Sequence, residues 1–162
     1  ALLSAEVKVV FRSASEVVSA SSQAIEPLLL DNLEVTCSQY QRDPKLLLLN
    51  ADNRQVSGEQ FCSHLLRSHC PVTNQPDWGT LTIRYSGPAI NPEALLRYIV
   101  SFRQHNGFHE QCVEQIYSDI MTECQPELLT FYAQYTRRGG IDINPWRSND
   151  SEPLVLDRVW RQ

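Results

Sequence analysis

Cys70 is the residue of this 162-residue chain that is best placed to act as a nucleophile. Pro71 follows it, and the nearby Gln75-Pro76 pair predicts a turn that keeps the thiol near the surface, where a thiolate can meet a ligand. Asp77 comes at the start of a predicted strand, so a carboxyl group is expected beside the thiol. The other four cysteines lie in apolar, periodic stretches, where a free cysteine is usually a small buried hydrophobe. A packed thiol is therefore the alternative for Cys70.

His109 and Glu110 offer acid/base and anchoring groups further along the chain. Behind them, residues that can be buried recur at four-residue intervals: Cys112, Ile116, Ile120 and Cys124. This spacing predicts a helix from about Phe108, with His109 and Glu110 in its first turn. The positive potential of a helix N-terminus favours an ionised Glu110, whose two oxygens can accept hydrogen bonds side by side. On spacing alone, an ordinary acid that complements the helix dipole is the simpler interpretation.

The segment 137–140 reads Arg-Arg-Gly-Gly and predicts a tight turn between strands at 128–136 and 141–143. Two arginines beside glycines also suit a phosphate group, because guanidinium groups bind oxygens and glycine lets the backbone come close. A solvated hairpin tip explains the segment equally well.

Three stretches of the chain together resemble the NADPH-dependent nitrile reductases of queuosine biosynthesis, which act on 7-cyano-7-deazaguanine (preQ0). These are residues 69–79 (HCPVTNQPDWG), 101–110 (SFRQHNGFHE) and 137–149 (RRGGIDINPWRSN). They occur in the order found in that family and cover most of the chain from residue 63 to residue 149. The resemblance is more specific than any one of the three motifs.

The resemblance implies a role for each candidate site residue. Cys70 would add as a thiolate to the nitrile carbon and form a covalent thioimidate, and Asp77 would manage protons for the nitrogen. His109 and Glu110 would bind the substrate. Arg138 and Gly139 would contact NADPH, the cofactor that reduces the nitrile to the aminomethyl group of preQ1.

One departure from the family bears on domain organisation. The Glu-Ser-Lys-Ser motif, which contributes to substrate and NADPH binding, is absent, and in two-module members it lies in the N-terminal module. The chain therefore resembles a C-terminal module at residues 33–162, preceded by the trailing strands of another module at residues 1–32. It also begins without methionine, so we expect a piece of a longer protein that is inactive alone or needs its partner module.

Periodicity predicts the order of the elements. Strands are expected at residues 6–13, 28–30, 33–40, 78–86, 128–136 and 141–143, and helices at 57–69, 91–106 and from 108. An amphipathic segment is expected within residues 150–162. From residue 33 onward, disregarding the short helix at 57–69, the order is strand, strand, helix, helix, strand, strand. This order predicts an α+β fold with an antiparallel sheet and two helices. The resemblance sharpens this to the tunnelling fold, whose modules associate into barrels, and implies a homo-oligomer, a dimer of two-module chains.

Composition limits the remaining function classes. A net charge of -5 and a pI near 5.3 give no support to a nucleic-acid-binding surface. Five cysteines without a dense framework suit a reducing cytoplasm, and no apolar run is long enough to span a bilayer. Two alternatives stay open. One is a zinc-dependent hydrolase of a purine or pterin, with ligands among His69, Cys70, His109 and Cys112, although no standard zinc spacing is present. The other is a non-catalytic module that completes an oligomeric interface.

Overall fold

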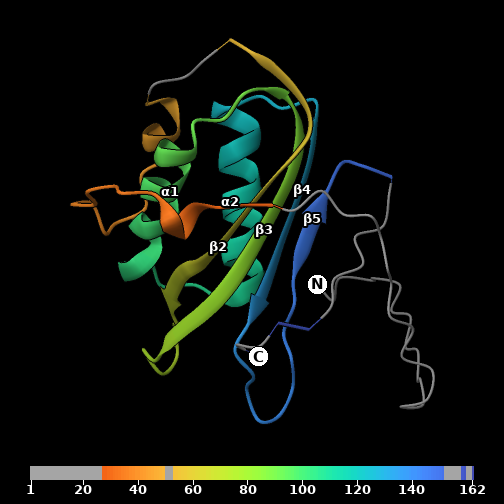
Figure 1. Cartoon of the computed structure of the whole chain (residues 1–162). Coiled ribbons are helices and arrows are strands. Elements are labelled where there is room, and N and C mark those ends of the chain that lie inside the picture. Colours follow the sequence, from red (N-terminus) through yellow and green to blue (C-terminus); the bar gives the residue numbers. More distant parts are fainter. Residues whose placement is uncertain (1–26, 50–52, 152–157, 160–161) are drawn as a thin grey trace, which may run out of the picture.

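The computed structural model describes residues 27–49, 53–151, 158–159 and 162, and these form an α+β unit (Figure 1). Five strands make one sheet in the order β1-β2-β3-β4-β5: Leu28–Leu29, Gln55–His69, Pro76–Pro88, Leu128–Tyr135 and Trp146–Ser148. All neighbouring pairs are antiparallel except β1 and β2, which run parallel. The predicted antiparallel sheet is therefore confirmed for β2 to β5, while β1 makes the whole sheet mixed.

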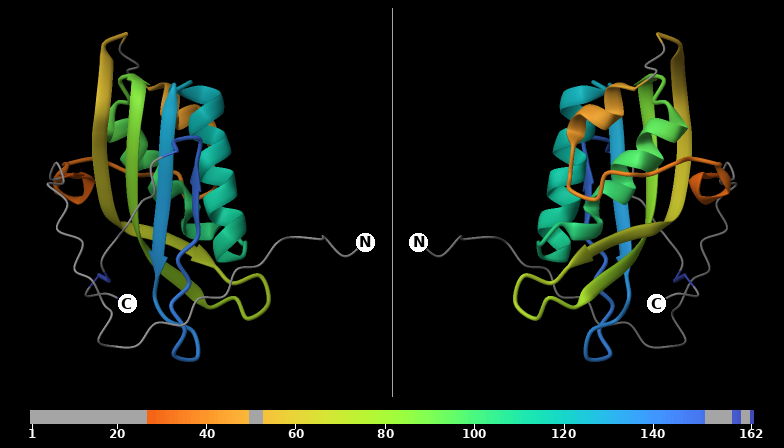
Figure 2. Two further views of the ribbon diagram at one scale, coloured as in Figure 1. Left: turned by 90° about the vertical axis from the view of Figure 1, so that its right-hand side faces the viewer. Right: turned by 90° about the vertical axis from the view of Figure 1, so that its left-hand side faces the viewer.

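Two helices pack against one face of the sheet (Figure 2): α1 (Pro92–Ser101) and α2 (His109–Glu123). Asn91 caps α1, because its side chain accepts a hydrogen bond from the backbone N–H of Ala94 at 3.0 Å, and Pro92 occupies the first turn. The core between helices and sheet holds large buried side chains, among them Phe61, Tyr98 and Phe131. From β2 onward the order is strand, strand, helix, helix, strand, strand, as predicted for the fold, although the first strand is β2 and not the predicted strand at 33–40.

The predicted helix at 57–69 is wrong, because these residues belong to the long strand β2. The reason is a β-bulge between Ser63 and Leu66, where β2 advances three residues while β3 moves from Leu81 to Gly79. Side chains facing the helices therefore change phase, from Phe61 and Ser63 before the bulge to Leu66 and Ser68 after it. Before and after the bulge the buried residues alternate as in any strand, but the two alternating sets are offset by one residue. Together they resemble the spacing of buried residues in a helix.

The predicted strand at 33–40 is also wrong. Its alternation is present, since Leu33, Val35 and Cys37 are partly buried against the core and the residues between them are exposed. No strand is assigned in this described segment: it packs mainly through its side chains, and the carbonyl of Tyr40 accepts a hydrogen bond from the backbone N–H of Gln104 at 3.0 Å. The residues after it form a short 3₁₀ helix, Pro44–Leu48.

The hairpin after β4 is longer than predicted. Arg138 and Ile141 form an isolated antiparallel bridge across the Gly139-Gly140 turn, as a two-residue loop should. Both glycines adopt the left-handed backbone that this loop type requires, with φ of 59° and 83°. The returning strand is β5 at Trp146–Ser148, however, and not 141–143.

Some predictions lie wholly or largely outside the described residues. These are the strand at 6–13 and most of the segment within 150–162. The module boundary near residue 32 stays a prediction. Leu30, which lies just before it, is completely buried in the core cluster. Within the described ranges, none of the helices combines the length and the apolar character needed to cross a membrane.

Candidate active site

Three segments meet at one end of the sheet, where β2 ends, α2 begins and the 137–142 hairpin turns (Figure 2). They enclose a cleft of about 300 Å³ lined by eight residues: Cys70, Thr73, Asp77, Phe108, His109, Glu110, Arg138 and Ile143. Five of the six predicted site residues thus line a single cleft. Gly139, the sixth, lies at the hairpin tip next to Arg138, and no atom lies within 4 Å of the position where a Cβ would be.

The turn that follows β2 presents Cys70 to the cleft. Its backbone N–H donates to the carbonyl of Gln75 and its own carbonyl accepts from Asn74, both at 2.9 Å. Asn74 takes the left-handed conformation that closes this turn, with φ of 57°. The side-chain hydroxyl of Thr73 and the backbone of Thr73 and Val72 hydrogen-bond the sulfur and lower the pKa of the Cys70 thiol. Its environment therefore favours the nucleophilic thiolate.

Asp77 lies beside this thiol at the start of β3 and is only 3% exposed. Its Oδ1 lies 3.1 Å from Nε of Arg138 and 3.2 Å from Nε2 of His109, and Nη2 of Arg138 also contacts Oδ1. No donor among the described residues hydrogen-bonds Oδ2 of Asp77. One oxygen of the carboxyl group is thus held by cationic or polar neighbours, and the other is available to a ligand.

Arg138 connects the two loops that form the cleft. Besides Asp77, its guanidinium group donates to the side-chain oxygen of Gln75 in the Cys70 turn. The sequence predicted a cofactor contact for Arg138 and missed its ion pair with Asp77, since Asp77 lies on β3 and Arg138 in the hairpin after β4. Strand pairing could have indicated it, because the end of β4 lies beside the start of β3, with Tyr135 opposite Gly79.

The first turn of α2 supplies the third side of the cleft. His109 is 7% exposed, and its ring stacks on that of Tyr135. Glu110 is exposed in the same turn, as predicted, and Phe108, which precedes the helix, is 49% exposed. The backbone N–H of Phe108 donates to the side chain of Gln111 at 3.0 Å, which fixes the start of the helix.

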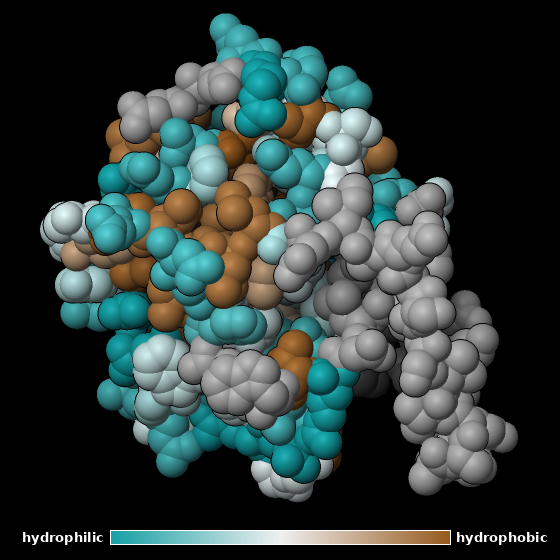
Figure 3. Space-filling view, in the orientation of Figure 1, coloured by the Kyte–Doolittle hydropathy of each residue, from teal (hydrophilic) through white to brown (hydrophobic). Residues whose placement is uncertain are grey.

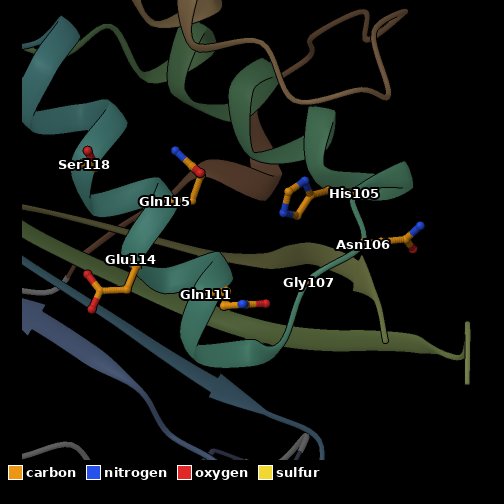
Figure 4. A pocket seen from close by; sticks show the side chains of 7 residues that line it. All are labelled: His105, Asn106, Gly107, Gln111, Glu114, Gln115 and Ser118. Carbon is orange, nitrogen blue, oxygen red and sulfur yellow. The ribbon is translucent and has the colours of Figure 1, made fainter. Parts of the chain in front are cut away.

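A second cleft of about 540 Å³ lies along α2 and the segment that precedes it (Figure 4). Its lining is polar and includes Gln111, Glu114 and Gln115. These three side chains already have partners within the protein: the N–H of Phe108, the guanidinium of Arg147 and the carboxylate of Asp119, respectively. The larger cleft thus offers few uncommitted groups, and its lining holds no cysteine.

The zinc alternative finds no support in the geometry. Among the described residues, no group of three or more His, Cys, Asp or Glu side chains could hold a metal ion. Of its four proposed ligands, Cys112 is completely buried, and burial raises the pKa of its thiol. His69 Nδ1 lies 3.2 Å from the backbone oxygen of Asn74.

Comparison with known proteins indicates the class of protein to which this chain is similar. Residues 76–153 match the family of QueF-like proteins. The solved apo structure of the archaeosine synthase QueF-Like shares the fold, with a TM-score of 0.56 and 15% identity over 62% of this chain and 100% of that one. This likeness confirms the predicted tunnelling-fold architecture.

Curated relatives are more similar, and they are NADPH-dependent 7-cyano-7-deazaguanine reductases. The protein of Delftia acidovorans is 58% identical over 127 residues, which are 78% of this chain and 45% of the relative. The protein of Chromobacterium violaceum is 53% identical over 134 residues (82% and 47%), and that of Burkholderia orbicola 49% over 151 residues (93% and 55%). The chain spans about half the length of the curated relatives it matches.

Thr73 gives the site its first testable property. Replacing Thr73 with valine removes the side-chain hydrogen bond to the sulfur, so the pKa of Cys70 should rise towards its ordinary value. The measurement is the rate of alkylation of Cys70 by iodoacetamide as a function of pH, followed by peptide mass spectrometry. We expect the midpoint of the profile to move to higher pH. Thr36→Val, at an exposed position outside the cleft, is the control, and equal midpoints in all three proteins would contradict the assignment.

Proposed function

We propose that this chain provides the catalytic cleft for the NADPH-dependent reduction of the nitrile of preQ0 to the aminomethyl group of preQ1, in queuosine biosynthesis. The observation that supports this most directly is the convergence of Cys70, Asp77 and Glu110 on one cleft from three separate segments. A thiol for nitrile addition, a carboxyl group for proton transfer and a carboxylate for a guanine-like edge are the groups that the reaction needs.

Covalent addition is the first step of the proposed mechanism. The Cys70 thiolate attacks the nitrile carbon, a C–S bond forms, and one π bond of the nitrile breaks towards nitrogen. The nitrogen then takes a proton, which leaves a neutral thioimidate bound to the protein. Asp77 takes the proton that the Cys70 thiol gives up and passes it to the nitrogen from Oδ2, the oxygen that is free of Arg138 and His109. Because these neighbours hold Oδ1, the carboxyl group is fixed in orientation while it exchanges its proton.

Glu110 is the proposed anchor for the heterocycle. The amino and ring N–H groups of a guanine-like base can donate two parallel hydrogen bonds to one carboxylate, which a neutral amide cannot accept as strongly. His109 lines the same cleft and contacts Asp77, so it can also contact the substrate or the adduct. Phe108 offers an exposed ring beside the same cleft for stacking.

The hairpin tip suits a dinucleotide phosphate. Arg138 is partly exposed at the mouth of the cleft, and Gly139 leaves open space next to it. These two residues would hold NADPH, which when bound supplies the two hydrides for reduction of the nitrile carbon. We further propose a cytoplasmic homo-oligomer built from two-module chains, without direct contact to nucleic acid or membrane. All five cysteines are free, as a reducing compartment requires.

The test is intact-protein mass spectrometry after mixing the chain with preQ0 without reductant. We expect a mass gain of one preQ0, and we expect NADPH to remove it with release of preQ1. If the chain shows no adduct, the experiment is repeated with a protein that spans the full length of the relatives. An adduct there would show that a second module completes the cleft, and its absence from both would reject the proposed function.

Glu110→Gln should weaken binding of preQ0 by about 10- to 100-fold, because the charged acceptor is lost while the side-chain shape is kept. The concentration dependence of adduct formation measures this, and the rate at saturating preQ0 should change less than the half-saturating concentration. Glu93→Gln is a matched control, since Glu93 is likewise an acid in the first turn of a helix, α1, but lies outside the cleft. Equal half-saturating concentrations in the parent and Glu110→Gln would contradict the anchoring role.

A further inference from the structure

Tyr135 is a buried residue that packs against His109, one of the residues that line the candidate cleft. The last residue of β4, it is completely buried, and its ring lies against the imidazole of His109 with ring centroids 4.1 Å apart and planes 20° from parallel. The same imidazole points Nε2 at Oδ1 of Asp77, 3.2 Å away. A flat ring packed on a fixed flat surface can slide but cannot easily tilt, so the stack limits His109 to planes that keep this contact.

Gly79 makes room for this arrangement. It pairs with Tyr135 across β3 and β4, and a Cβ at Gly79 would lie 3.2 Å from Cδ1 and 3.3 Å from Cε1 of the tyrosine ring. The backbone of Gly79 does not need glycine for its conformation, because its φ is not positive. The glycine is therefore explained by space, and a larger residue there would displace the ring of Tyr135, on which His109 stacks.

The hydroxyl end of Tyr135 lies in a buried polar cluster with Ser68 and Cys112. Neither the tyrosine nor the serine hydroxyl has a hydrogen-bond partner of good geometry among the described residues. Burial raises the pKa of Tyr135 well above its ordinary value, and the nearby Cys112 and Asp77 act in the same direction, so the phenol stays protonated. Because this hydroxyl is poorly satisfied, the contribution of Tyr135 to the site must come from its ring.

We propose that Tyr135 is a positioning residue of this site: its ring fixes the plane of the His109 imidazole and thereby keeps His109 on Asp77. The catalytic consequence rests on the proposed function, whereas the stack is a property of the free protein. Gly79 contributes to the same arrangement, since the absence of a side chain there lets the ring of Tyr135 lie close to β3.

The structural part is tested by NMR on protein labelled at histidine, without preQ0. Ring protons of His109, assigned by their loss in His109→Gln, should be shifted upfield by the tyrosine ring. Tyr135→Phe keeps the ring and should keep this shift, whereas Tyr135→Leu and Gly79→Ala should change it. Thermal unfolding checks that each variant folds; Gly79→Ala, which deletes no core side chain, replaces Tyr135→Leu if that protein does not fold. An unchanged His109 spectrum in the folded variants would overturn the proposal.

The functional part uses adduct formation with preQ0 at several pH values. We expect Tyr135→Leu and Gly79→Ala to slow adduct formation at saturating preQ0 by about 10- to 100-fold and to alter its pH profile, with Tyr135→Phe close to the parent. A purely structural role would lower the unfolding temperature without altering the pH profile. Loss of the NMR shift with unchanged kinetics would also overturn the positioning role. If even the parent forms no adduct, the proposed function fails, and the NMR result alone decides whether Tyr135 positions His109.

Discussion

Replacing Cys70 with alanine is expected to abolish the preQ0 adduct and to lower reduction of preQ0 by about 10⁴-fold or more. The reason is that the sulfur provides the electron pair for the only covalent bond between protein and substrate in the proposed mechanism. Without it, hydride would have to add to an unactivated nitrile. Intact-protein mass spectrometry measures the adduct, and the appearance of preQ1 measures turnover.

Two further variants make the Cys70 experiment specific. Cys70→Ser keeps the size of the side chain but offers a hydroxyl that is far less nucleophilic, so it should behave like alanine. Cys37→Ala removes a different half-buried free thiol outside the cleft and should retain both adduct and turnover. An adduct of full yield in Cys70→Ala, or its loss in Cys37→Ala, would assign the nucleophile to another residue.

Asp77→Asn is expected to slow adduct formation by about 10²- to 10⁴-fold. Asparagine has nearly the same shape as aspartate, but it cannot deliver a carboxylic proton to the nitrile nitrogen. It also leaves the guanidinium of Arg138 without the charge that it contacts in the parent protein. The rate constant for the appearance of the adduct at saturating preQ0 is the appropriate measurement, because weaker binding is then removed from the comparison.

Asp142→Asn is the control for this experiment. Asp142 also pairs with an arginine of the hairpin, Arg137, at 3.8 Å, but it is exposed and does not line the cleft. Loss of an ion pair with an arginine of the hairpin is therefore common to both variants, and only Asp77 lies beside the thiol. If the two variants slowed adduct formation equally, the effect of Asp77 would be electrostatic support of the loop instead of proton transfer.

Much of the candidate site could be predicted from sequence, because Cys70 and Asp77 are residue types that the chemistry requires and the resemblance to the nitrile reductases implied roles for the others. Cys70, Asp77, His109, Glu110 and Arg138 were all singled out, and all line the same cleft. The contacts among them could not be predicted in the same way. The Arg138–Asp77 pair joins residues that lie far apart in the chain, and the stack of His109 on Tyr135 joins a helix to a strand.

The two helices and strands β3 and β4 were predicted well, since caps, turn residues and uninterrupted periods define them. The failure at β2 has a physical cause, because a strand that contains a bulge does not keep one period. Segment 33–40 fails for the opposite reason. Its alternation is regular, but pairing with a neighbouring strand is a property of the whole sheet and leaves no mark in local sequence.

The bulge in β2 is also stabilised by hydrogen bonds to a residue outside that strand, Asp31. The backbone N–H of His64 donates to Oδ2 of Asp31 at 3.0 Å, and that of Leu65 to the hydroxyl of Ser63 at 3.1 Å. The hydroxyl of Ser63 in turn donates to Asp31 at 2.6 Å, so a carboxylate near β1 stabilises the extra residue. This added residue determines which face of the sheet each later side chain of β2 occupies, up to Ser68. It also sets the direction in which the strand delivers the turn at Cys70. Deleting one residue there would leave the composition of the strand almost unchanged, yet it would turn its last residues over and direct the nucleophile away from Asp77.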